Sequence, residues 1–152
     1  LQHDTGYWQI QATRPQSLAY GLNDSPAGLA GWIVEKFRSW TDCDGDVERA
    51  FTKDQLLTNI TIYWVTGTIN SSTRYYFENT GPGRMQEPPR CRVPTGYADF
   101  PGEHYRMPLA WAKDKLNLVE VNQMPKGGHF AALQVPDLFV EEARRFFRNH
   151  RP

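Results

Sequence analysis

A histidine on a glycine-rich turn is the residue of this chain best suited to acid–base chemistry. Residues 127–132 read Gly-Gly-His-Phe-Ala-Ala and lie between an apolar, strand-like run and an amphipathic segment. Two glycines free the backbone from the limits that a Cβ imposes, so the turn can bring the imidazole of His129 to the edge of a site. Histidine titrates near neutrality, which suits a general base. The sequence therefore predicts a catalytic base, against the alternative of a histidine on a solvated turn.

A carboxylate that could orient this histidine stands earlier in the chain. Glu103 ends the tetrapeptide Phe-Pro-Gly-Glu at residues 100–103. Pro108 then opens a predicted short helix, and residues 116–121 alternate apolar and polar side chains as a strand does. An acid after one strand and a histidine after the next is the order in which α/β hydrolases present their last two triad members. The spacing therefore predicts that Glu103 and His129 form an acid–histidine pair.

These two elements resemble those of a known family, the microsomal-type and fungal or bacterial epoxide hydrolases of the α/β-hydrolase superfamily. In that family the charge-relay acid lies in a Phe-Pro-x-Glu or Phe-Pro-x-Asp element, and the base lies in Gly-Gly-His-Phe-Ala-Ala. Glu103 and His129 match those positions residue by residue. The resemblance implies the α/β class and an α/β-hydrolase fold, with no metal or organic cofactor.

The same resemblance implies two phenols that hold the epoxide oxygen. Tyr7 follows Thr-Gly, as does the first tyrosine of the family's lid. The second family tyrosine lies in a helix ending Arg-x-Tyr-x-Glu-Asn, which here reads Arg-Tyr-Tyr-Phe-Glu-Asn at residues 74–79. Tyr76 is the match, and Tyr75 is the neighbour most easily mistaken for it. Residues 22–30 and 59–68 also read like the family's lid, so the resemblance covers nearly the whole chain.

Two catalytic elements of the family have no counterpart in these residues. The family uses an aspartate nucleophile on a strand-to-helix elbow and an oxyanion loop of the His-Gly-x-Pro kind, and neither pattern occurs here. We therefore expect the chain to be the C-terminal portion of a longer hydrolase. Residues 1–85 would form the helical lid, and residues 86–152 would form the C-terminal part of the core. The expected partners are the N-terminal half of the hydrolase, on the same or a separate chain, and a small apolar epoxide.

The resemblance implies epoxide hydrolysis to a vicinal diol through an alkyl-enzyme ester. Tyr7 and Tyr76 would donate to the epoxide oxygen while the absent aspartate attacks. His129, oriented by Glu103, would then activate water. Two alternatives stay open: another α/β hydrolase, such as a haloalkane dehalogenase or an esterase, which needs no lid phenols, and a non-catalytic truncated fragment.

Cap and periodicity signals place the helices that would carry these residues. Asp24 or Ser25 is expected to cap a helix with Pro26 in its first turn, and Thr52 with Gln55 fits a capping box for another. The expected apolar faces are Leu29, Trp32, Ile33 and Phe37 for the first helix and Leu56, Leu57, Ile60 and Trp64 for the second. Gly67 should interrupt the second helix, and the helix with the tyrosines should end at Gly81.

The last helix is predicted to begin at Pro136 and to be amphipathic. Its buried side chains would be Phe139, Val140, Ala143 and Phe147, and its solvated ones Glu141, Glu142, Arg144 and Arg145. An acidic run with Asp42, Asp44, Asp46 and Glu48 is spaced like calcium ligands, but Val47 and Lys53 stand where a calcium loop needs Gly and Glu. The run is therefore expected to be a solvated lid loop without metal.

Composition narrows the classes of partner. The 17 basic side chains equal the 17 acidic ones, so the chain offers no electrostatic argument for nucleic acid or a membrane surface. No run of eighteen apolar residues predicts a membrane span, and no signal peptide opens the sequence. Two cysteines are too few for a disulfide framework. These features favour a cytoplasmic protein. A homo-oligomer is also possible from the sequence.

Overall fold

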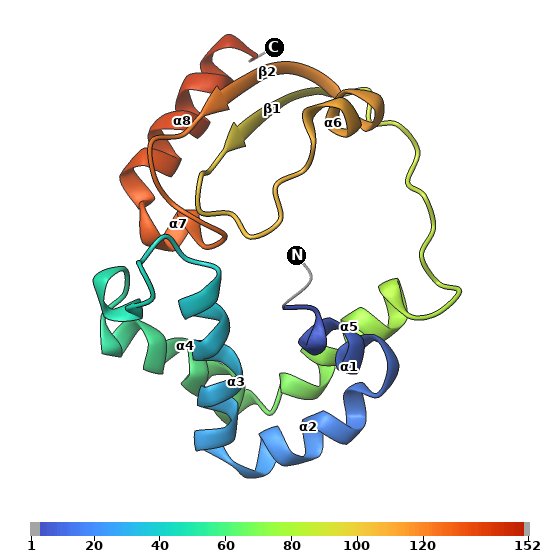
Figure 1. Ribbon diagram of the computed structural model, residues 1–152, viewed down its shortest axis with the longest axis vertical. Coiled ribbons are helices and arrows are strands. Elements are labelled where there is room, and N and C mark those ends of the chain that lie inside the picture. The colour runs from blue at the N-terminus through green and yellow to red at the C-terminus, as the bar shows by residue number, and fades with distance from the viewer. Residues whose placement is uncertain (1–3, 151–152) are drawn as a thin grey trace. The chain divides into compact units, whose positions relative to one another are not determined.

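Helices make up most of the computed structural model, which describes residues 4–150 (Figure 1). The elements in chain order are α1 (Gly6–Thr13), α2 (Pro15–Asp24), α3 (Pro26–Ser39), the 3-10 helix η1 (Val47–Arg49), α4 (Lys53–Thr66), α5 (Ile69–Thr80), β1 (Pro94–Asp99), α6 (Leu109–Lys115), β2 (Asn117–Gln123), α7 (Ala131–Gln134) and α8 (Pro136–Asn149).

The chain divides into two compact units. Unit 1 comprises the chain up to Lys36 together with Phe51–Glu87, and unit 2 comprises Phe37–Ala50 together with the chain from Pro88. The predicted boundary near residue 85 lies close to the second junction. Residues 37–50, which were expected in the lid, instead pack with the segment that follows Pro88.

Unit 1 is a set of helices around a small apolar core. The Ser25 hydroxyl accepts from the Gly28 N–H at 3.0 Å at the start of α3, so Ser25 rather than Asp24 supplies the cap. The predicted capping box of α4 is present, because Thr52 and Gln55 exchange side-chain-to-backbone hydrogen bonds. Gly67 ends α4 in the left-handed region, at φ +62°. The buried core consists of Leu22, Leu29, Ile60 and Ile69.

The structure of unit 1 differs from the sequence analysis at two points. Leu57 was expected on the buried face of α4, but 56% of its surface is exposed, because Leu56 and Ile60 define the inward face and Leu57 lies beside it. Helices α1 and α2 were not foreseen as separate elements. Pro15 at the first position of α2 lacks the N–H that a continuous helix would use, so the helix ends and a new one begins there.

Unit 2 is built on a short parallel β-sheet. Strands β1 and β2 pair in parallel from Pro94 opposite Asn117 to Asp99 opposite Gln123, with a shift in register between Thr95 and Gly96. Helix α6 connects them, as the strand–helix–strand order predicted. Because both strands end at the same edge of the sheet, the loops that follow them meet there.

Helix α8 begins at Pro136 as predicted, but its apolar face is not buried. Phe139, Val140 and Phe147 all stay exposed, Phe147 by 59% of its surface. The helix contacts β1 through Phe146, whose ring would lie 2.6 Å from a Cβ on Gly96. Phe139 and Phe147 of α8, together with Phe146 and residues of β1, line an open apolar groove of about 380 Å³.

Two of the charged residues expected to face water on α8 bind the sheet instead. Glu142 accepts from the Asn122 side chain at 2.8 Å and from Arg145, and Arg145 also pairs with Glu120. Asn122 and Glu120 both belong to β2. These polar contacts between α8 and β2 therefore come from side chains that amphipathic patterning assigns to solvent.

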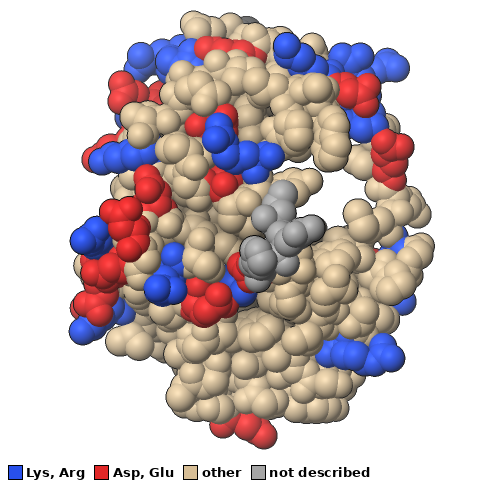
Figure 2. All heavy atoms as spheres, viewed as in Figure 1, with Lys and Arg blue, Asp and Glu red and all other residues tan. Residues whose placement is uncertain are grey.

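The surface carries mixed charge. In the view of Figure 2, Lys and Arg side chains lie among Asp and Glu side chains rather than forming one extended patch, in keeping with the net charge of zero. Across residues 4–150, no helix has the length and apolar character needed to cross a membrane.

Candidate active site

The turn that carries His129 needs both of its glycines, for different reasons. Gly127 adopts φ +109°, a conformation that side chains other than glycine rarely take. Gly128 has no such φ, but a Cβ there would lie 2.6 Å from the carbonyl oxygen of Trp40. The first glycine allows the turn, and the second allows the backbone to approach residue 40.

Residues 40–42 hold this turn in place. The His129 N–H donates to the Trp40 carbonyl at 2.8 Å, and the Gly127 N–H donates to the Asp42 carboxylate at 3.2 Å. Gln134 links both sides, since its amide donates to the Asp42 carbonyl and its oxygen accepts from the Gly128 N–H. Sequence reasoning missed this support, because residues 40–42 lie far from His129 along the chain.

The acidic run has a structural role of its own. Asp44 and Asp46 pair with Arg49 at 3.0 and 3.9 Å, and Asp46 also accepts from the Glu48 N–H to cap η1. Asp42, as described, holds the histidine turn. The run belongs to unit 2, and the side chains of Asp44 and Asp46 are exposed to solvent as expected.

The loop after β1 carries Glu103 and is fastened at two points. Gly102 donates its N–H to the Gly127 carbonyl at 2.8 Å, which joins the acid loop to the histidine turn. Asp99 ends β1, and both its carboxylate oxygens accept from the Arg106 guanidinium. Hydrogen bonds from Arg106, and another from Gln123, hold the pKa of the buried Asp99 below its usual value although burial opposes this. The ion pair thus closes the loop on either side of Glu103.

Glu103 and His129 meet as predicted. Nδ1 of His129 lies 3.0 Å from each carboxylate oxygen of Glu103, and both side chains are partly exposed, at 40% for His129 and 26% for Glu103. Burial raises the pKa of Glu103, but hydrogen bonds from the Tyr105 N–H and His129 and the nearby imidazoles outweigh it and hold the pKa below its usual value. The carboxylate is therefore charged at neutral pH and faces Nδ1, which leaves Nε2 to act on a proton.

A second imidazole stands beside this pair, and sequence reasoning missed it. Nδ1 of His104 lies 2.8 Å from Oε1 of Glu103. The His104 ring stacks on Trp40 with centroids 4.4 Å apart and planes 9° apart, and it meets the His129 ring edge to face at 4.9 Å. The only sequence signal for His104 was its place directly after Glu103.

The two histidines and Glu103 form the one cluster with metal-ligand character found within residues 4–150. One ligand atom from each lies within 4.8 Å of the others. Both Nδ1 atoms already face the carboxylate at hydrogen-bond or ion-pair distance, so the arrangement is also that of an acid–histidine relay.

The predicted phenols also lie together, in unit 1. The Tyr7 ring, on α1, meets the Tyr76 ring, on α5, edge to face with centroids 5.9 Å apart. Burial, followed by the nearby Tyr76 and Asp4, raises the pKa of Tyr7 to about 12, so this phenol keeps its proton at neutral pH. The ammonium of Lys36 lies 4.9 Å from the Tyr7 ring centroid and pairs with Asp4 at 2.6 Å.

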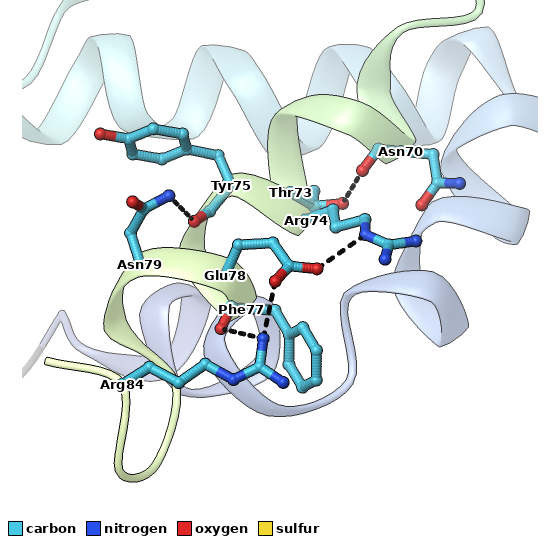
Figure 3. Close-up of polar contacts among 8 residues, drawn as sticks. All are labelled: Asn70, Thr73, Arg74, Tyr75, Phe77, Glu78, Asn79 and Arg84. Atoms are coloured by element: carbon cyan, nitrogen blue, oxygen red, sulfur yellow. Dashed lines mark hydrogen bonds and ion pairs between the residues drawn. The ribbon is translucent and has the colours of Figure 1, made fainter.

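The end of α5 is fixed by an ion network shown in Figure 3. Glu78 accepts from Arg74 at 3.1 Å and from Arg84 at 2.7 Å, and the Arg84 guanidinium also lies 4.0 Å from the Phe77 ring centroid. Tyr75 extends away from this network, and 65% of its surface is exposed. Tyr76 is thus the tyrosine whose ring contacts Tyr7, and its catalytic role stays a prediction from the motif match.

The four predicted site residues therefore form two close pairs. Tyr7 and Tyr76 belong to unit 1, whereas Glu103 and His129 belong to unit 2. Each pair joins residues from separate elements, so each depends on the fold of its own unit.

Comparison with known proteins gives the family. No family model matches the chain. It is 46% identical over 156 residues to "Epoxide hydrolase 1" of Sus scrofa. That alignment covers 96% of this chain and 34% of the relative. It is 45% identical over 150 residues to a "Putative epoxide hydrolase" of Stigmatella aurantiaca. That alignment covers 98% of this chain and 34% of the relative.

Solved structures agree with the sequence relatives. The crystal structure of juvenile hormone epoxide hydrolase from Bombyx mori matches with a TM-score of 0.90 at 35% identity, over 99% of this chain and 41% of that one. Epoxide hydrolase from Aspergillus niger matches with a TM-score of 0.79 at 28% identity, over 95% of this chain and 36% of that one. The chain spans about a third of the length of its curated relatives. It belongs to the epoxide hydrolases of the α/β-hydrolase fold, as the motifs around Glu103 and His129 predicted.

Proposed function

We propose that this chain supplies the electrophilic and acid–base groups of an epoxide hydrolase that converts an epoxide to a vicinal diol. The observation that carries the proposal is the Glu103–His129 pair, with Nδ1 at 3.0 Å from both carboxylate oxygens. The nucleophile would be an aspartate in the part of the hydrolase that lies outside the matched third of the relatives. The substrate would be a small apolar epoxide.

The first step is ring opening. A carboxylate oxygen of the aspartate attacks a ring carbon, the carbon–oxygen bond of the epoxide breaks, and the leaving oxygen becomes an alkoxide that takes up the proton of one of the two phenols. The proton released when the ester is hydrolysed later returns to that phenol through solvent. Tyr7 and Tyr76 donate hydrogen bonds to that oxygen as its charge develops. The raised pKa of Tyr7 supports this role, because the phenol stays protonated at neutral pH. Each such donor lowers the barrier by roughly 2 to 4 kcal/mol.

The second step is hydrolysis of the alkyl-enzyme ester. Nε2 of His129 takes a proton from water, and the resulting hydroxide adds to the ester carbonyl. The bond from that carbon to the diol oxygen then breaks as the imidazolium returns its proton to the leaving oxygen, and the remaining carboxylic acid loses its proton to restore the aspartate. Glu103 holds the ring by Nδ1 and stabilises the imidazolium that forms. The phenols and the Glu103–His129 pair thus act on different steps, and this allows separate tests.

The decisive variant is His129→Gln in the complete polypeptide that carries this sequence. Ring opening should continue while ester hydrolysis stops, so the intact protein should gain the mass of one epoxide. Glu103→Gln should slow the same step less severely, because the base remains. Intact-protein mass spectrometry after substrate addition measures both. Full turnover by His129→Gln, or no adduct in any variant, would refute this assignment.

The phenols distinguish an epoxide hydrolase from other α/β hydrolases. Tyr7→Phe and Tyr76→Phe should each slow ester formation by about 10²-fold, since each removes one donor to the developing oxyanion. Tyr75→Phe is the matched control and should leave the rate unchanged, because that ring is exposed. Stopped-flow measurement of ester formation tests this. Unchanged ester formation in both phenol variants would refute the role of the phenols, and no ester formation from an epoxide in the parent would favour a dehalogenase or an esterase.

A further inference from the structure

His104 and Glu103 are adjacent in sequence and in contact at their side chains. Nδ1 of His104 lies 2.8 Å from Oε1 of Glu103, the same carboxylate that faces Nδ1 of His129. We propose that His104 is a positioning residue: held against the Trp40 ring, it fixes the Glu103 carboxylate toward His129. This inference rests on the proposed function and adds a member to its relay.

The carboxylate of Glu103 needs such support. It is carried by a flexible side chain on a loop, and it is partly exposed to solvent. The Tyr105 N–H donates to Oε1 at 3.2 Å, and His104 approaches the same oxygen. A carboxylate offers about four acceptor positions, so it can engage both of these groups and His129 together. With Oε1 held from two directions, the carboxylate cannot rotate freely away from His129.

Trp40 connects the two histidines. Only 8% of its surface is exposed, and its ring stacks on His104 at 4.4 Å with planes 9° apart. Its carbonyl accepts from the His129 N–H at 2.8 Å, and its ring also meets the His129 ring edge to face at 5.2 Å. One buried residue therefore sets the ring plane of His104 and the backbone position of His129, and Glu103 lies against both imidazoles.

The consequence is confined to one chemical step. A misplaced Glu103 leaves the imidazole of His129 in several orientations, which impairs proton removal from water. Ring opening by the aspartate does not use this pair. His104 should therefore affect ester hydrolysis and leave ester formation unchanged.

Three substitutions in the complete polypeptide separate the effects. His104→Phe keeps a ring to stack on Trp40 but removes the nitrogen that contacts Glu103. His104→Asn restores an amide near the position of Nδ1. His150→Phe is the matched control, because His150 is an exposed residue at the end of α8 that contacts Phe146. All measurements include a chelator, so a bound metal ion cannot produce the difference.

The kinetic readout is the rate of each step. In His104→Phe, ester hydrolysis should fall about tenfold, because Glu103 loses one close polar contact, with ester formation and KM for ring opening unchanged. His104→Asn should recover most of the lost rate, and His150→Phe should match the parent protein. Equal ester hydrolysis in His104→Phe and the parent, or a loss equal in both steps, would overturn the inference.

A second readout needs no catalysis. A histidine Nδ1 proton that is hydrogen-bonded to a carboxylate gives a low-field NMR signal, assigned here by its loss in His129→Gln. In His104→Phe this signal should shift or broaden, and in His150→Phe it should stay. A change in the signal with no epoxide turnover by the parent would support the positioning role and refute the proposed function. An unchanged signal would refute the positioning role even in an active enzyme.

Discussion

Unit 1 and unit 2 bury their apolar residues to different extents. Unit 1 closes a core around Leu29, which is fully buried, with α4 and α5 contributing to it. In unit 2, by contrast, the strongly amphipathic α8 has no buried residue, and Val119 and Val121 on β2 are exposed. A helical set can satisfy its backbone within each helix and close on itself, whereas a parallel sheet needs cover on both faces. The two-stranded sheet therefore leaves its own valines and the apolar face of α8 uncovered. Unit 1 also has exposed apolar side chains, such as Leu57 and Val65, but they surround a closed core.

The largest expected effect comes from the core of unit 1. Leu29→Ala should lower the free energy of unfolding of this unit by about 2 to 5 kcal/mol, because it leaves a cavity in a fully buried position. Hydrogen exchange should show the loss in α3 and α4 and spare β2. Leu57→Ala, on the exposed side of α4, is the control and should change little. Equal effects of the two substitutions would contradict the assigned core.

The contact between α8 and β1 tests unit 2 in the same way. Gly96→Val should destabilise this unit by about 1 to 3 kcal/mol, since the new side chain would enter the space of the Phe146 ring. The double variant with Phe146→Ala should recover part of the loss, because it empties that space. Chemical denaturation followed by exchange of β1 amides measures both. No recovery in the double variant would mean that the strand, rather than the ring contact, limits stability.

The Asp99–Arg106 pair makes the free energy of unfolding of unit 2 depend on pH in the acid range. The pKa of Asp99 lies below its unfolded value, so its contribution is complete above the unfolded pKa of about 3.9 and is lost as the pH falls through the folded pKa. Arg106→Gln should lower the free energy of unfolding at pH 7 only modestly, because Arg106 is half exposed, and it should flatten the acid dependence. Urea unfolding between pH 2 and 7 tests this. If the free energy of unfolding of Arg106→Gln fell equally steeply with decreasing pH, another titrating group would be responsible for the acid dependence.

The smallest change in stability is expected where unit 2 is open. Val121→Thr with Phe147→Ser should change the free energy of unfolding by less than about 0.5 kcal/mol per site, because both residues are exposed. The same substitutions should reduce self-association of the isolated 152-residue chain, since exposed apolar sheet surface promotes it. Analytical ultracentrifugation measures the change. A parent chain that is monomeric at all concentrations would refute this expectation.

The amino-acid sequence by itself determined the local features and the identity of the paired residues. Cap residues predicted the starts of α3 and α4, and Pro136 predicted the start of α8, because such signals lie within a few residues of the helix end. The motifs around Glu103 and His129 predicted a pair that the structure brings to 3.0 Å. The motif match also selected Tyr76 rather than Tyr75. The Tyr76 ring contacts Tyr7, and its catalytic role stays a prediction.

Only the tertiary structure decided which residues from distant parts of the chain support that pair. Trp40 and Asp42 lie beside the histidine turn because residues 37–50 pack into unit 2, and no local pattern records such a contact. The role of His104 was inferred only from its distance to Glu103 and its stacking on Trp40. Periodicity predicted that α8 would bury Phe139 and Phe147, but burial depends on whether another element covers the face. The sequence pattern of a helix describes the face it offers, whereas the surrounding fold decides whether that face is covered.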